Sequence, residues 1–424
     1  MTQPRATAAP SERLDTHPAG APAQRSTEPS GEFVALVALL TSLVALSIDA
    51  MLPALGRIAT ELQAAHPNSR QFVVLCFFAG LGAGQLFAGP LSDRIGRKPA
   101  ILIGLLVYAA GSVMCWLASD FTLFLAGRVI QGMGAAGPRV VSIAMVRDRQ
   151  AGAAMARTMS LVMTAFIMVP VLAPVLGQAV LAVTGWRSIF LGFFAIAVWA
   201  AVWLTVRQPE TLPPERRRPV TPSALLDAAR QVLTHRVSMA YTLTAGLVLG
   251  LLVSYLGVCQ QVFGEFYGQG DLFVAYFAVL ASGVGLASAV NARLVMRLGM
   301  RRLSRLALQT IAVLTLAMLA GCLITGALPP LALFVVWLFP IFFCMGMLFG
   351  NCNALAMEPM GHIAGMAASI IGSLTSLLSV LAGGLVSQQY DGTVLPLVIG
   401  YAVLGVLALL IASTMGRPSS PTVH

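Results

Sequence analysis

Charged residues are scarce in this chain of 424 residues, and their scarcity excludes a soluble protein. Asp, Glu, Lys and Arg make up 10% of the sequence, whereas an ordinary globular domain carries about 25%. Hydrophobic residues make up 58%, and the mean hydropathy is +0.84. A soluble fold of this composition could not cover its surface with polar groups. The sequence therefore predicts an all-α protein that crosses a membrane several times.

Cysteine and histidine are also few, and neither forms a chemical site. The six cysteines all fall within apolar runs, and none has the spacing of metal ligands. The five histidines all lie outside the middle of these runs. We therefore expect no metal, no cofactor and no enzyme active site, and we interpret the cysteines as small residues of the apolar core.

The positive charge of the chain indicates its orientation rather than a nucleic-acid partner. The formal net charge is +10, but the basic residues gather in connections between apolar runs. The connections on one side hold 21 Lys and Arg residues and those on the other side hold 3, while Arg128 and Arg139 lie within runs. Because basic connections stay in the cytoplasm, we expect both termini on the cytoplasmic side of a bacterial inner membrane.

Twelve apolar runs are long enough to span a bilayer, which needs about 20 residues. They form two groups of six, since one longer connection separates the sixth run from the seventh. The first group covers roughly 33–55, 71–91, 100–118, 121–147, 157–183 and 188–206, and the second covers roughly 238–264, 272–291, 303–325, 331–357, 363–387 and 393–415.

The connection at 207–237 is rich in proline and carries three consecutive arginines at 216–218. Two groups of equal size joined in this way are typical of a duplicated transporter. We therefore expect an N-terminal six-helix bundle at 33–206, a cytoplasmic linker at 207–237 and a C-terminal bundle at 238–415. The residues 1–32, rich in Pro, Ala, Ser and Thr, are expected to form a disordered cytoplasmic tail, and 416–424 a second tail.

The connection between the second and third runs has the most specific pattern. It reads Gly-Pro-Leu-Ser-Asp-Arg-Ile-Gly-Arg-Lys-Pro from Gly89 to Pro99. Without any family comparison, this connection is a tight turn with a cluster of cations, which an ordinary cytoplasmic loop would also show. The spacing Gly-x-Leu-x-Asp-Arg-x-Gly-Arg-Lys resembles the signature loop of the major facilitator superfamily. The resemblance implies that family's fold, with twelve transmembrane helices in two pseudosymmetric six-helix bundles.

In that family the acid of this loop helps to latch the two halves on the cytoplasmic side. The resemblance therefore implies a latch or gate made of Gly89, Asp93, Arg94, Gly96, Arg97 and Lys98, with Arg147 and Asp148 at the end of the fourth run. The connection between the eighth and ninth runs repeats the pattern weakly, from Asn291 to Arg302, and lacks the acid.

Four further stretches resemble the bicyclomycin/chloramphenicol-resistance branch of the drug:proton antiporters. They are Ser47-Ile-Asp-Ala-Met-Leu-Pro-Ala-Leu55, the run from Arg128 to Arg139, Val169-Pro-Val-Leu-Ala-Pro-Val-Leu-Gly177, and the segment from Ser254 to Gly264. The resemblance covers nearly all of 33–415. It implies an exporter motif in the fifth helix at Pro170, Pro174 and Gly177, although the family prefers glycine where this chain has Ala173 and Gln178.

Asp49 stands out without any family knowledge, because a carboxylate within hydrocarbon costs roughly 2.5–3.5 kcal/mol. At 1.5 Å per residue, Asp49 and Arg128 both lie roughly 10 Å from the outer end of their helices. We interpret Asp49 as the proton-coupling group and Arg128 as the cation that tunes its pKa. A static ion pair, or an acid at the membrane interface, is the alternative.

Other polar residues at membrane depth are candidates for a substrate cavity. Arg139 lies about 20° from Arg128 around a helix, and it could equally extend to the cytoplasmic surface. The remaining candidates are Tyr255, Gln260, Gln261, Tyr276, Asn351 and Asn353. Each of these could instead make a hydrogen bond between helices. We expect Glu358 at the cytoplasmic end of the tenth run, as an interfacial or gate residue.

The resemblance implies a proton-coupled antiporter that exports small, mostly apolar compounds by alternating access. Its expected partners are the small-molecule substrate, protons and the lipid bilayer, and we expect it to function as a monomer. A specific exporter of a sugar or an amino acid fits the same residues, and the sequence does not identify the substrate. A non-transporting membrane sensor is disfavoured, because no signalling domain accompanies the two bundles.

Overall fold

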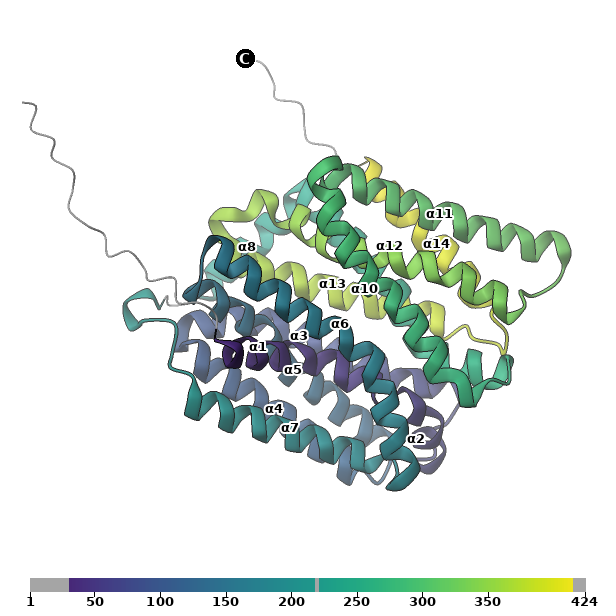
Figure 1. Ribbon diagram of the computed structural model, residues 1–424, viewed down its shortest axis with the longest axis horizontal. Coiled ribbons are helices and arrows are strands. Elements are labelled where there is room, and N and C mark those ends of the chain that lie inside the picture. Colours follow the sequence, from purple (N-terminus) through teal and green to yellow (C-terminus); the bar gives the residue numbers. More distant parts are fainter. Residues whose placement is uncertain (1–29, 218–220, 415–424) are drawn as a thin grey trace, which may run out of the picture.

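The computed structural model describes residues 30–217 and 221–414, and within these ranges the chain is helical and contains no strand. Its long helices lie side by side in two groups (Figure 1). The first group contains α1 (Gly31–Asp49), α3 (Phe72–Ile95), α4 (Arg97–Leu117), α5 (Phe121–Arg149), α6 (Gly152–Val183) and α7 (Arg187–Arg207). The second contains α9 (Arg236–Gln261), α10 (Phe273–Leu298), α11 (Met300–Thr325), α12 (Leu331–Met357), α13 (Ala364–Ser387) and α14 (Leu395–Thr414).

Every long helix in the described ranges is apolar enough to cross a membrane, although α12 and α13 follow each other as one apolar stretch. The short turn η6 (Glu358–Ile363) divides them, and Met360 leaves helical geometry there. Pro359, the second residue of this turn, has no N–H with which to extend α12. The eleven apolar stretches therefore contain twelve helices, which confirms the predicted fold class of two six-helix bundles.

Short elements lie at the two ends of the bundle. One end carries η1 (Leu52–Ala54), α2 (Leu55–Glu61), η2 (Pro67–Gln71), the π-helical turn η4 (Val262–Phe266) and η5 (Gly270–Leu272). The opposite end carries η3 (Pro214–Arg216) and α8 (Pro222–Thr234), which lie within the predicted linker. We call these the α2 end and the linker end (Figure 1). The expected tails fall almost entirely outside the described residues.

Small residues set the packing within the first half. The Asp120 side chain caps α5 by accepting the N–H of Leu123 at 2.8 Å. A Cβ at Gly134 would overlap the backbone of Tyr108 on α4, and one at Gly132 would overlap the backbone of α3. Such glycine contacts let helix backbones approach closely in a membrane. Because α5 is held tightly between α3 and α4, its polar side chains are fixed in position.

The two halves meet along two helix pairs. The helix α3 packs along α13, and α6 packs against α10. Near the middle of the first pair, the hydroxyl of Ser376 donates to the side chain of Gln85 at 3.3 Å. In the second pair, Ile167 reaches the backbone of Gly285. These two helix pairs therefore form the main contacts between the halves.

Candidate functional site

Asp49 lies where the first membrane span breaks. The sequence predicts one continuous helix over 33–55, but α1 ends at Asp49 and η1 follows before α2 begins at Leu55. Pro53 accounts for this difference, because it has no N–H to donate to the carbonyl of Asp49 four residues earlier. The Asp49 residue is only 5% exposed, and it forms no ion pair within the described ranges.

The helix α6 packs directly against this break. A Cβ at Gly177 would overlap the backbone carbonyl oxygen of Ala50. Glycine is therefore required for this approach. Pro174 is buried one turn before Gly177, and Pro170 is half-buried one turn earlier still. Through Gly177, the predicted exporter motif of α6 reaches the residue that follows Asp49.

Arg128 lies in a separate polar cluster on α5. It is fully buried, and its Nε donates to the carbonyl of Val73 on α3 at 3.1 Å. Its Nη1 donates to the side chain of Gln131, which in turn donates to Ser112 on α4 at 2.8 Å. The guanidinium also lies 4.6 Å from the centre of the Phe77 ring. Its Nη2 has no hydrogen-bond partner among the described residues.

Asp49 and Arg128 do not form an ion pair. The hydroxyl of Ser47 forms a hydrogen bond with the hydroxyl of Tyr108 on α4, and the carbonyl of Tyr108 accepts from Ser112 of the Arg128 cluster at 2.8 Å. Ser47 therefore faces the Arg128 cluster. Asp49 follows two residues later and points about 200° away around the helix. The structure thus separates two residues that the sequence places at similar depth.

The break after Asp49 instead lies against the second half of the molecule. The turn η1 that follows Asp49 contacts α9, on which Tyr255 and Cys259 are both buried. The Tyr255 ring packs edge-on against Phe342 of α12, with 4.9 Å between the ring centres. The Tyr255 hydroxyl has no hydrogen-bond partner among the residues described. A buried carboxyl and an unpartnered hydroxyl therefore lie where the two halves meet.

Arg97 organises the connection between α3 and α4. Its guanidinium pairs with Asp93 on α3 and with Asp148 at the end of α5, where the Nε–Oδ2 distance is 2.9 Å. Gly96 has a φ of 108°, which lets the chain turn between the two helices. A Cβ on Gly365 of α13 would lie 3.3 Å from the Asp93 carboxylate. Asp93 therefore lies at the contact between the two halves.

Four other residues of the predicted latch lie around this connection. A Cβ at Gly89 would overlap the hydroxyl of Ser369 on α13. Arg94 and Arg147 are exposed and have no ion-pair partner within 30–217 or 221–414. The ammonium of Lys98 donates to two backbone carbonyls at and just beyond the end of α7, at 2.8 and 2.9 Å.

Glu210, in the predicted linker, completes the connection, and no motif in the sequence points to it. Its carboxylate accepts the N–H groups of Arg97 at 2.9 Å and Lys98 at 3.1 Å, at the start of α4. A helix N-terminus favours negative charge. Burial raises the pKa of Glu210, but hydrogen bonds from the N–H groups of Leu212, Arg97, Lys98 and Thr211 lower it to below its ordinary value.

The second half has an ion pair in the corresponding place. Gly299, between α10 and α11, has a positive φ of 75°, as the glycine of the first connection does. Arg301 pairs with Glu358 just after α12 at 3.0 Å, in the same way that Arg97 pairs with Asp148 in α5. Glu358 is therefore the counterpart of Asp148, whereas the position that corresponds to Asp93 holds Met296.

Comparison with known proteins identifies the family. Residues 37–384 match the family model described as Major Facilitator Superfamily. The chain belongs to the major facilitator superfamily. An uncharacterised MFS-type transporter of Bacillus subtilis, YdgK, is 31% identical over 357 residues, which cover 83% of this chain and 87% of that protein. A bicyclomycin resistance protein homolog of Haemophilus influenzae is 27% identical over 382 residues, covering 89% and 94%.

These relatives confirm the resemblance to the bicyclomycin-resistance branch. A solved D-xylose-proton symporter superposes with a TM-score of 0.72 at 16% identity, covering 91% of this chain and 97% of that one. At this identity the likeness concerns the fold alone. The protein is a membrane-spanning facilitator for small molecules, which agrees with the expectation that it is not an enzyme.

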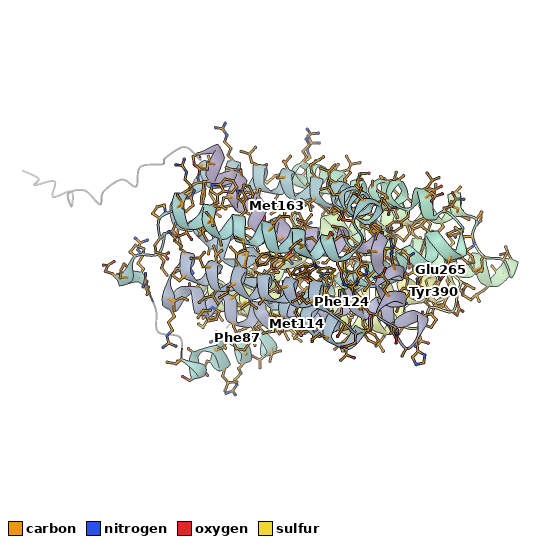
Figure 2. The ribbon with its side chains drawn as sticks, turned by 90° about the horizontal axis from the view of Figure 1, so that it is seen from below. Phe87, Met114, Phe124, Met163, Glu265 and Tyr390 are labelled. Atoms are coloured by element: carbon orange, nitrogen blue, oxygen red, sulfur yellow. The ribbon has the colours of Figure 1, made fainter. Side chains whose placement is uncertain are left out.

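At the α2 end of this facilitator, polar contacts join the two halves. Arg70 of η2 pairs with Glu265 of η4 at 2.6 Å and donates to Gln260 at 3.0 Å. Figure 2 shows Glu265 close to Tyr390 at this end of the bundle. We call this set the α2-end clamp: Asn68, Arg70 and Gln71 with Gln260, Gln261, Glu265, Gln388 and Tyr390. Two predicted cavity residues, Gln260 and Gln261, are thus part of a contact between halves.

The remaining cavity candidates of the second half lie apart from one another. The Tyr276 ring stacks on Phe263, with 5.2 Å between centres. Asn351 of α12 exchanges hydrogen bonds with Asn291 of α10 at 3.1 and 2.8 Å. Asn353 is exposed. This reciprocal pair is a hydrogen bond between helices, which the sequence left open for Asn351 as the alternative to a cavity role.

Proposed function

We propose that this facilitator exports small, mostly apolar compounds in exchange for protons, and that Asp49 carries the proton. The observation that supports this proposal is the place of Asp49. It is a buried carboxyl at a break in the first span, beside the junction of the halves and without a paired cation in the described chain. Discontinuous helices commonly form coupling-ion sites in transporters.

Alternating access requires two gates, and the structure contains cross-half contacts at both ends. The α2-end clamp joins the halves at one end, and Asp93 meets Gly365 at the other. We infer that rocking about the α3–α13 and α6–α10 contacts opens one gate as the other closes. An opening at the α2 end would let Asp49 take up a proton, and an opening at the linker end would let substrate displace it.

The direction of export follows from the proposed orientation. The strong excess of basic residues in the connections at the linker end supports a cytoplasmic location for that end. Because the proposed path runs between the two halves of one chain, a monomer is sufficient. Reporter fusions within 207–237 and at the C-terminal tail should indicate cytoplasm, and fusions within 265–271 and 326–330 should indicate the outside. A reversed pattern would contradict export in this direction.

Proton release from purified protein tests the coupling. A growth-inhibition panel in an efflux-deficient bacterial host first identifies a transported compound. Adding that compound to wild-type protein should release protons, and Asp49→Asn should abolish the release, because an amide has no proton to exchange. The matched control is Asp271→Asn, which changes an exposed acid in η5. Undiminished release from Asp49→Asn would show that another group carries the proton.

A further inference from the structure

The interior of this facilitator holds more cations than anions. Apart from Asp49 at the break in the first span, the charged residues of the described long helices lie within five residues of a helix end, with two exceptions, Arg128 and Arg139. Ionised Asp49 leaves one negative charge against two positive charges, and protonated Asp49 leaves the two positive charges alone. A buried ion without a partner costs several kcal/mol. This cost indicates that the arginines have a purpose other than stability.

Arg128 has local hydrogen-bond acceptors, but Arg139 does not. Within the described ranges, only the backbone carbonyl of Arg139 takes part in a side-chain hydrogen bond, and its guanidinium has no carboxylate partner. The direction of the side chain follows from its neighbours. Gly137 and Pro138 both pack against Gly104 of α4. Arg139 follows Gly137 by two positions and Pro138 by one. At 100° per residue its side chain is therefore turned about 200° and 100° from theirs, so it points away from α4.

Arg139 lies deep within α5 and is partly exposed. Its neighbours Gly137 and Pro138 are buried, and Arg139 itself keeps intermediate exposure. It lies ten residues before the end of α5 at Arg149, which is about 15 Å at 1.5 Å per residue. This depth exceeds the reach of one arginine side chain to the linker end. The guanidinium of Arg139 therefore has unused hydrogen-bond donors at a depth where the other described charges, apart from Asp49 and Arg128, are absent.

We propose that Arg139 binds the substrate, and that the compounds this facilitator transports carry an anionic group such as a carboxylate. A guanidinium presents a fork of N–H donors that matches carboxylate and phosphate oxygens. The net positive interior favours such compounds and opposes organic cations. The proposal rests on the proposed transport function and specifies the charge class of its substrate.

Two dyes that share a xanthene ring test this charge selection. Fluorescein is an anion at neutral pH, and rhodamine 6G is a cation. Fluorescence polarisation with the purified full-length protein should show tighter binding of fluorescein to wild type. Arg139→Gln should weaken fluorescein binding by roughly tenfold or more, the loss expected for a charge-assisted hydrogen bond. It should leave rhodamine 6G binding unchanged or improved.

Further variants separate charge from packing. Arg139→Lys keeps the charge and should retain part of the fluorescein affinity, whereas Arg139→Met keeps the bulk and should not. The matched control is Arg157→Gln, which removes an exposed cation near the start of α6 and should bind fluorescein as wild type does. Size-exclusion profiles establish that each variant is folded.

Three results would overturn the proposal. In the first, wild type binds rhodamine 6G more tightly than fluorescein. In the second, wild type and Arg139→Gln bind fluorescein with equal affinity. In the third, neither dye shows saturable binding. All three measure binding and do not depend on proton exchange. A failure of the Asp49 experiment would therefore leave this test intact, and a failure here would leave the proton coupling intact.

Discussion

Gly177 of α6 lies against the backbone carbonyl of Ala50, the residue that follows Asp49 at the end of α1. This contact joins two features that are distant in the chain, the break in the first span and the fifth-helix motif. It is a backbone contact, so a rotamer change cannot relieve an added methyl group there. The position of Asp49 in the bundle therefore depends on a glycine more than a hundred residues later.

Gly177→Ala should destabilise the protein by about 1–3 kcal/mol, the usual cost of overpacking, and should lower transport. The added Cβ would overlap the carbonyl of Ala50 and push α1 and α6 apart. The measurement is thermal unfolding in detergent together with efflux at matched protein amount. Gly192→Ala on α7 is the control, because a Cβ there meets nothing within 4 Å. Equal stability of the two variants would contradict the predicted overlap.

Asp93→Asn and Asp148→Asn should each lower transport while leaving the protein in the membrane. Both carboxylates pair with the guanidinium of Arg97, so either change disorganises the same cluster. Because the residues share one partner, the double variant should lose less than the sum of the two single losses. Efflux rates of the four proteins at equal membrane amounts measure this coupling. Strict additivity of the losses would show that the two acids act independently.

Glu210→Gln should weaken the start of α4 at neutral pH and have little effect in acid. The folded-state pKa of Glu210 lies below its ordinary value of about 4.3. Its stabilisation is therefore fully present above pH 4.3 and is lost as the pH falls through the lower folded value. Hydrogen exchange of peptides containing Arg97 and Lys98 measures the effect, with the exposed Glu215→Gln as the control. A difference in exchange between Glu210→Gln and wild type that increases as the pH falls would contradict this prediction.

Glu265→Gln should open the α2 end more often. The change removes the ion pair between Glu265 and Arg70, which crosses between the halves. Cys259 is fully buried on α9, less than two turns before Glu265, and should react faster with a thiol reagent in the variant. Mass spectrometry of the labelled protein gives the rate at that cysteine. Glu61→Gln, which breaks pairs only within the first half, should leave the rate unchanged.

The local features of this protein were open to prediction, and the contacts between distant segments were not. The charged turn from Asp93 to Lys98 could be located because its residues are contiguous, but the pairing of Asp93 with Arg97 depends on the turn at Gly96. Pro53 is visible in the sequence, but the site at which a proline interrupts a membrane helix depends on what packs beside it. Arg70 and Glu265 are almost two hundred residues apart, and no periodicity links them. The separation of Asp49 from Arg128 could likewise not be predicted. The sequence gives the depth of a residue in the membrane, but not the direction in which its side chain points.

The sequence by itself determined that this chain spans a membrane twelve times in two bundles. A bilayer tolerates backbone polar groups only when each helix satisfies its own, so every apolar run of sufficient length becomes a helix. The tertiary structure alone decided which polar residues meet. It placed the break after Asp49 against α9, placed Glu210 on the start of α4 and left Arg139 without an ion-pair partner in the described chain. The reason is physical: the rotation and close approach of packed helices depend on side-chain shapes contributed by segments far apart in the chain.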